Sequence, residues 1–198
     1  MRILEVAERL FAERGLDGVS MRDITSEAET DLGLVNYHFT SKDGLFETVL
    51  ARRIDELSRL RNERIEALGG IFTLPDVIAV FLEPLHERLG SNDAGWRYYA
   101  ELASHVANMR RYNQFRTLHL DNTARAVIDA LQQVFPAARH EALYWSYIFL
   151  VSGLAQVMTG SDRLTILSDG LCDLRDIDTA FAELHDFCVA GIAALVSK

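Results

Sequence analysis

Apolar residues recur every three or four positions along most of this chain, a spacing that predicts amphipathic α-helices. The segments with this spacing are residues 3–15, 20–28, 32–39, 41–68, 75–89, 96–107, 110–135, 141–159 and 176–196. No segment alternates apolar and polar residues as a half-buried strand does, and no segment repeats another. The pattern therefore predicts an all-α fold of about nine helices.

The longest predicted helix, residues 41–68, divides the chain into two units. At 1.5 Å per residue it is about 40 Å long, which is enough to join two domains. We expect a small N-terminal domain over residues 1–46 and a larger helical domain over residues 47–198. Pro84 lies inside the next helix and predicts a kink or break near Leu82 and Glu83. Residues 160–175 are predicted to form a long, solvated acidic loop.

Two short helices around a tight turn are predicted near the N-terminus. Ser20 is a suitable N-cap, and Asp23 stands three residues later, where it can complete a capping box. A short polar connection over residues 29–31 leads to Leu32, Val35 and Phe39, which recur at helical spacing. This arrangement is typical of a helix-turn-helix, whose second helix lies in the major groove of DNA.

Residues 3–50 closely resemble the N-terminal DNA-binding domain of TetR-type transcriptional regulators. The matching pieces are Leu10-Phe11-Ala12-Glu13-Arg14-Gly15, Ser20-x-Arg22-Asp23-Ile24, Asn36-Tyr37-His38-Phe39 and Ser41-Lys42-Asp43-x-Leu45-Phe46. The resemblance implies that the DNA-contacting residues are Ser20, Arg22, Thr30, Asp31, Leu32, Gly33, Leu34, Asn36, Tyr37, His38 and Lys42.

Each of these roles has an alternative. Tyr37 and His38 could pack against the first helix, and Leu32 and Leu34 could be buried. Lys42, which the resemblance makes the clearest phosphate partner, could be a solvated surface lysine.

The charge balance argues for weak DNA binding. The chain carries a formal net charge of −9, and residues 1–68 hold ten Lys or Arg against fourteen Asp or Glu, a balance of −4. Proteins that bind nucleic acid usually present a basic surface. Glu29 occupies the turn position that the family often fills with glycine, and a left-handed conformation there costs on the order of 1 kcal/mol. Asp31 adds a second negative charge. We expect modest affinity, and the alternative is a helical small-molecule-binding protein with weakened DNA binding.

The larger domain has the composition of a helical ligand-binding module, although the same composition also fits a plain core. An effector for it would be a mostly apolar or aromatic small molecule. The candidate pocket residues are Trp96, Tyr99, Leu102, His105, Phe115, Arg116, His119, Tyr144, Ile148 and Gln156.

The last two predicted helices are apolar around more than one stripe, which indicates burial on two sides. The resemblance implies that they pair with a second copy in a two-fold four-helix interface, so that the homodimer reads a palindromic operator with half-sites about 34 Å apart or a multiple of that distance. The candidate interface residues are Leu143, Leu150, Gly153, Leu154, Val157, Phe181, Leu184, Cys188 and Ile192.

Enzyme signatures do not occur in the sequence. It has no Gly-rich phosphate loop, no nucleophile elbow and no zinc-type cluster, so we expect no catalytic residue, metal site or cofactor. Glu83 with His86, and Glu101 with His105, share helix faces but do not complete a di-iron motif. No signal peptide and no membrane span are expected, because the most apolar run, residues 143–158, is shorter than the ~18–20 residues a span needs. With two cysteines that suit a reducing compartment, these features predict a cytoplasmic protein with no membrane partner.

Overall fold

The computed structural model describes residues 2–107 and 109–197, and within them it contains ten α-helices, one 3-10 turn (η1) and no strand. The helices are α1 (Arg2–Arg14), α2 (Met21–Glu27), α3 (Leu32–Phe39), α4 (Lys42–Ala67), α5 (Leu74–Leu89), α6 (Gly95–Val106), α7 (Asn113–Val134), α8 (His140–Met158), α9 (Arg163–Leu167) and α10 (Ile177–Val196), and η1 is Arg110–Tyr112. The all-α prediction is confirmed. The prediction of about nine helices missed α9, a short helix within the predicted acidic loop.

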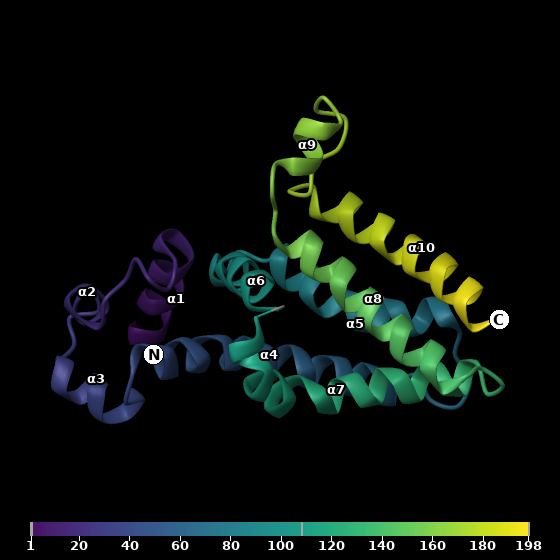
Figure 1. Cartoon of the computed structure of the whole chain (residues 1–198), viewed down its shortest axis with the longest axis horizontal. Helices are drawn as coiled ribbons and strands as arrows, with labels where there is room; N and C mark the ends of the chain where they lie inside the picture. The colour runs from purple at the N-terminus through teal and green to yellow at the C-terminus, as the bar shows by residue number, and fades with distance from the viewer. Residues whose placement is uncertain (1, 108, 198) are drawn as a thin grey trace.

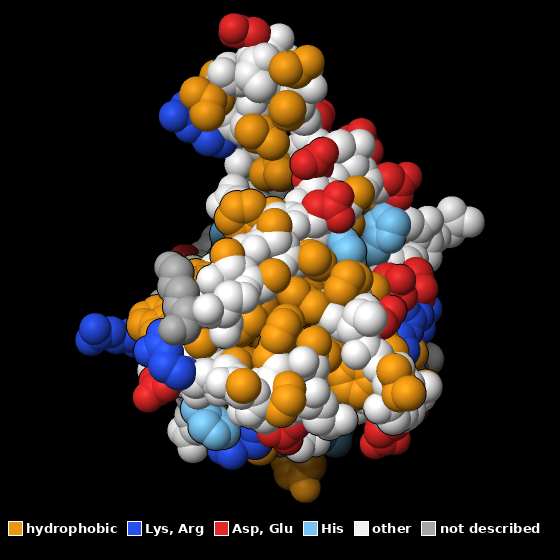
Figure 2. Space-filling view, turned by 90° about the vertical axis from the view of Figure 1, so that its right-hand side faces the viewer, with side chains coloured by type: hydrophobic (Ala, Val, Ile, Leu, Met, Phe, Trp, Pro, Cys, Tyr) orange, Lys and Arg blue, Asp and Glu red, His pale blue; other side chains and the backbone are white. Residues whose placement is uncertain are grey.

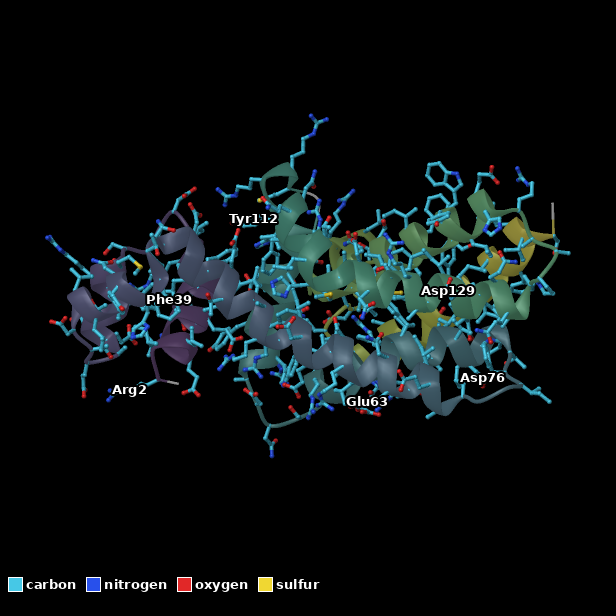
Figure 3. All side chains as sticks on the ribbon, turned by 90° about the horizontal axis from the view of Figure 1, so that it is seen from below. Arg2, Phe39, Glu63, Asp76, Tyr112 and Asp129 are labelled. Atoms are coloured by element: carbon cyan, nitrogen blue, oxygen red, sulfur yellow. The ribbon has the colours of Figure 1, made fainter. Side chains whose placement is uncertain are left out.

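The helices form a small bundle and a larger one, joined by α4 (Figure 1). Helices α1 to α3 lie at one end of the molecule, and α4 runs from them along α7 and α5. Helix α10 packs against α5 and α8, while the loop that carries α9 projects from the larger bundle. Seen from below, Arg2 and Phe39 lie at the small-bundle end, Glu63 far along α4, and Asp76 at the opposite end (Figure 3).

Local capping fixes the ends of the short helices. Ser20 accepts a hydrogen bond from the Asp23 amide at 3.2 Å, and the Asp23 carboxylate accepts from the Ser20 amide at 2.8 Å. This is the predicted capping box. Ser41 caps α4 by accepting from the Gly44 amide at 3.0 Å. Glu29 has a φ of 52°, so the left-handed turn expected between α2 and α3 is present.

Pro84 does not break α5, so of the kink or break predicted near Leu82 and Glu83 the break is absent. The helix is continuous from Leu74 to Leu89. Phe81, Leu82 and Leu85 on either side of Pro84 are each no more than 3% exposed. We attribute the continuity to this burial, since tertiary packing supplies most of the stability of a protein helix and can offset one missing backbone hydrogen bond.

A buried ion-pair network joins the two bundles where α1, α4 and α6 meet. The Glu8 carboxylate, on a side chain that is 2% exposed, accepts hydrogen bonds from Arg53 Nε at 3.0 Å and Arg53 Nη2 at 2.9 Å. Arg53 also donates to Asp93 at 2.6 Å, and its guanidinium lies 4.5 Å from the centre of the Trp96 ring. A Cβ at Gly95 would collide with the Arg53 guanidinium and the Glu8 carboxylate, so this contact requires glycine.

Candidate nucleic-acid interface

One side of α3 is held in the core and the other faces solvent. Val35 is 2% exposed and attaches the helix to the small bundle. Leu34 and Tyr37 are 53% and 82% exposed, and Asn36 and His38 are exposed with them. Burial of Leu34 and packing of Tyr37 and His38 on the first helix are therefore excluded, while Leu32 is half-buried. The exposed side of α3 forms a short, mainly uncharged surface, which we call the α3 face: Gly33, Leu34, Asn36, Tyr37 and His38.

The residues before the α3 face serve the turn itself. The Asp31 carboxylate is the N-cap of α3 and accepts from the Leu34 amide at 2.9 Å. The Thr30 hydroxyl donates to the Ala28 carbonyl at 3.2 Å. A Cβ at Gly33 would lie 3.0 Å from Asp31 Oδ1, so glycine suits the capped turn and also leaves room for an approaching duplex.

Two cations of residues 1–46, Arg2 and Lys42, already have partners. Arg2 forms an exposed 3.0 Å ion pair with Glu29, and this hydrogen bond lowers the pKa of the Glu29 carboxyl. Lys42 is half-buried, and its Nζ donates to the Leu16 carbonyl at 2.7 Å and the Val19 carbonyl at 3.0 Å. A lysine ammonium has three N–H groups, so Lys42 keeps one for a phosphate. It is not the solvated surface lysine of the alternative reading. Arg22 is exposed at the start of α2.

A cavity of about 120 Å³ lies in the larger bundle between α4, α5, α6, α7 and α8. Of the ten candidate pocket residues, Tyr99, Phe115 and Arg116 line it. The other seven do not line this cavity. Trp96 and Leu102 are buried elsewhere, His119 pairs with Asp55 at 2.8 Å, and His105, Tyr144, Ile148 and Gln156 are exposed. Their helical spacing gave no information about which helices would surround the space.

Sequence reasoning missed three polar residues that line this cavity, Arg61, Thr123 and Tyr147. Arg61 could have been found, because it continues the apolar stripe of α4 through Ile54 and Leu57. A charged residue in register with a buried stripe indicates either an ion pair or a binding site.

Most of the side chains predicted to form the dimer contact lie inside the protomer. No more than 8% of each of these seven residues is exposed: Leu143, Leu150, Leu154, Phe181, Leu184, Cys188 and Ile192. They fill the core, including the contact between α8 and α10. Gly153 belongs to that contact, since a Cβ there would lie 2.5 Å from Leu184 Cδ1. Val157 is half-buried.

The outward side of α8 carries aromatic and apolar residues instead. This α8 face consists of Tyr144, Trp145, Ile148 and Phe149, which are between 46% and 61% exposed. Trp145 and Phe149 stack with ring centres 5.7 Å apart. On α10, Phe187 is 74% exposed. Figure 2 shows the end of the molecule that carries the C-terminus, where hydrophobic side chains gather in the middle of the surface.

Helix α10 is long and apolar enough to cross a membrane by length and composition alone, with a mean hydropathy of 1.5. Only 28% of the scored window is buried in the protomer. The helix nevertheless packs along α5 and α8, and Asp176 caps its start by accepting from the Thr179 amide.

The two residues of the carboxylate–histidine pair on α5 have separate partners. Glu83 pairs with Arg64 at 3.0 Å, and His86 pairs with Asp178 at 2.7 Å. Among residues 2–107 and 109–197, no three His, Cys, Asp or Glu side chains are grouped as metal ligands.

Two family models match the chain. The model described as "Bacterial regulatory proteins, tetR family" matches residues 3–49, which include α1 to α3. The model described as "Tetracyclin repressor-like, C-terminal domain" matches residues 79–191, more than half of the chain.

Individual relatives agree with the family models. The chain is 31% identical over 109 residues to the HTH-type transcriptional repressor KstR2 of Rhodococcus jostii, covering 54% of this chain and 52% of that protein. It is 42% identical over 65 residues to the HTH-type transcriptional repressor Rv3405c of Mycobacterium tuberculosis, covering 33% of this chain and 35% of that protein. The matches thus span about half or less of these relatives. The fold is similar to that of the fatty acid degradation regulator FadR from Bacillus halodurans, with a TM-score of 0.64 at 12% identity over 96% of this chain and 97% of that one.

Proposed function

Because the chain belongs to the TetR family of bacterial regulatory proteins, we propose that it is a dimeric transcriptional repressor that an effector releases from DNA. Residues 1–46 form its DNA-binding unit, α3 enters the major groove, and a small molecule in the larger bundle controls the fit. The α3 face carries this proposal: it is solvent-exposed, it lies at the far end of the molecule from α10, and α4 connects it to the cavity.

The α8 face supports a two-fold dimer. Aromatic residues are enriched in protein interfaces. In a two-fold dimer the same surface of both subunits meets, so the α8 face of one protomer would contact the α8 face of the other. Helix α10 packs against α8 and is little buried within one protomer, so its outer side, with Phe187 74% exposed, is available to the same interface. A palindromic DNA site follows from this symmetry, with two α3 helices reading equivalent half-sites.

The dimer is tested by placing a charge on the α8 face. We expect Phe149→Glu to convert the protein from dimer to monomer in sedimentation velocity experiments, because the interface would bury an unpaired carboxylate. Tyr37→Glu is the control and should stay dimeric, because it places the same charge on an aromatic that is even more exposed, 82% against 56%, at the other end of the molecule. A Phe149→Glu protein that sediments like the unsubstituted dimer would contradict this interface.

The DNA-binding proposal is tested by selecting bound duplexes from a random pool at two salt concentrations. We expect an enriched palindrome and a shallow dependence of affinity on salt, since the cations near the α3 face are few and partly paired. If no sequence outcompetes random DNA, the regulator proposal fails.

The alternative, a helical small-molecule-binding protein with weakened DNA binding, is favoured by the negative charge at the turn before α3. Glu29 is paired with Arg2, so replacing it also frees that cation. We expect Glu29→Gly with Asp31→Asn to strengthen DNA binding, because asparagine keeps the N-cap and glycine accepts the positive φ. Unchanged binding would count against the alternative.

A further inference from the structure

Arg61 is a buried cation without a carboxylate partner. Its residue is 6% exposed, and it forms no ion pair with any other described residue. Its single hydrogen bond within the described chain runs from Nε to the Phe81 carbonyl at 2.8 Å. The guanidinium lies 4.1 Å from the centre of the Phe81 ring. The two terminal nitrogens are therefore left for another partner.

The absence of a partner is costly, which distinguishes Arg61 from the other buried arginine of α4. Burial lowers the pKa of Arg61, and two phenols, Tyr99 and Tyr147, oppose this only in part. Arg53 shows the opposite behaviour, because Glu8 and Asp93 compensate its burial and raise its pKa. Buried charges in proteins are normally paired, so an unpaired guanidinium calls for a ligand.

Other polar groups share the cavity with Arg61. The Thr123 hydroxyl is buried and has no hydrogen-bond partner among residues 2–107 and 109–197. Burial raises the pKa of Tyr99 to about 12, so its phenol remains a neutral donor at ordinary pH. Arg116 also lines the space, but its guanidinium is already bound to the Val106 and Met109 carbonyls at 2.9 and 3.1 Å.

The remaining walls are apolar, and the volume limits the ligand. Phe81, Phe115 and Leu154 line the cavity of about 120 Å³. An engineered apolar cavity of about 150 Å³ binds benzene, so one ring or a short branched chain is the right size. We propose that this cavity binds a small aromatic or aliphatic monocarboxylic acid, with its carboxylate paired to Arg61 and its apolar body against Phe81 and Phe115.

This inference rests on the proposed function in one respect, because it identifies the chemical class of the effector. Arg61 lies on α4, nineteen residues from Lys42 at the start of that helix, or about 29 Å along its axis. An acid bound at Arg61 would therefore act directly on the helix that carries the DNA-binding unit.

The test compares acids with their neutral amides on the full-length protein. Thermal unfolding is followed with benzoate and phenylacetate, and separately with benzamide and phenylacetamide, which have nearly the same shape. We expect the melting temperature to rise with acid concentration and to stay constant with the amides. Equal responses to acid and amide, or no response to either acid, would overturn the proposal without any variant being needed.

Arg61→Met then isolates the guanidinium. Replacing a buried charge by an apolar residue of similar length is often neutral or stabilising, so the variant should fold. We expect at least a tenfold loss of acid affinity in calorimetric titration. Arg59→Met is the control, because Arg59 lies on the same helix in an exposed pair with Glu63. An Arg61→Met protein that binds the acids as tightly as the Arg59→Met control would refute the assignment.

The DNA selection described above, carried out without acid, separates this inference from the regulator proposal. Recovery of a DNA site without any acid binding would refute the cavity assignment alone. Acid binding without a selected site would support the cavity assignment and refute the regulator proposal.

Discussion

Glu8 offers the sharpest test of how the two bundles are joined. Its carboxylate is 2% exposed and accepts three hydrogen bonds, two from Arg53 and one from Arg52 at 3.0 Å. Glu8→Gln keeps the shape but removes the charge, and it turns an N–H group toward the guanidinium donors. Removing one partner of a buried ion pair costs about 3–5 kcal/mol.

The lower end of this range applies here, because Asp93 still pairs with Arg53 at 2.6 Å on its solvent side. For a chain of this length, a loss of about 3 kcal/mol corresponds to a fall of roughly 6–12 °C in melting temperature. Far-UV circular dichroism during heating and in urea measures both quantities. Protein concentration must be held constant, since subunit association changes apparent stability.

The control is the exposed pair of Arg59 and Glu63, whose side chains are 58% and 55% exposed. Glu63→Gln should cost less than about 1 kcal/mol, as exposed ion pairs do. Adding Arg53→Met to Glu8→Gln should recover part of the loss, because it removes the cation that has lost its buried partner and keeps only the exposed Asp93. A Glu8→Gln protein no less stable than Glu63→Gln would refute the reasoning.

Three further outcomes follow from the same contacts. Gly95→Ala should cost about 1–3 kcal/mol of stability through overpacking against the Arg53 guanidinium. Gly191→Ala, where a Cβ would meet nothing within 4 Å, should instead stabilise α10 by about 0.5–1 kcal/mol. Urea unfolding measures the free energy of unfolding of both variants. Ser20→Ala should cost about 1 kcal/mol by removing the α2 cap, measured in the same way. The hydrogen bond from Arg53 lowers the pKa of Asp93, so Asp93 stabilises the fold above about pH 4 and this contribution is lost as pH falls through the lower native pKa. Asp93→Asn should therefore lose less stability than the unsubstituted protein on acidification; an identical loss would contradict this.

The sequence by itself determined the features that depend on near neighbours in the chain. Helix spacing and the Ser20–Asp23 capping box involve residues within a few positions of one another, so their geometry follows from local preferences. The left-handed turn at Glu29 was implied by the family resemblance instead, because glutamate by itself disfavours that conformation. The TetR resemblance in residues 3–50 is confirmed for the same reason, because it consists of such linked local signals.

Only the tertiary structure decided which apolar surfaces pack against each other inside the protomer. Helix α8 is apolar on two sides, and its packing against α6, α7 and α10 leaves Leu150 inside and Phe149 outside. Lys42 turned inward because the carbonyls of residues 16 and 19, more than twenty positions away, lie within reach of its ammonium. Arg61 became a candidate ligand-binding residue because five helices enclose it without supplying a carboxylate. Periodicity shows that a helix has a buried side, but the partners on that side are set by contacts between distant segments.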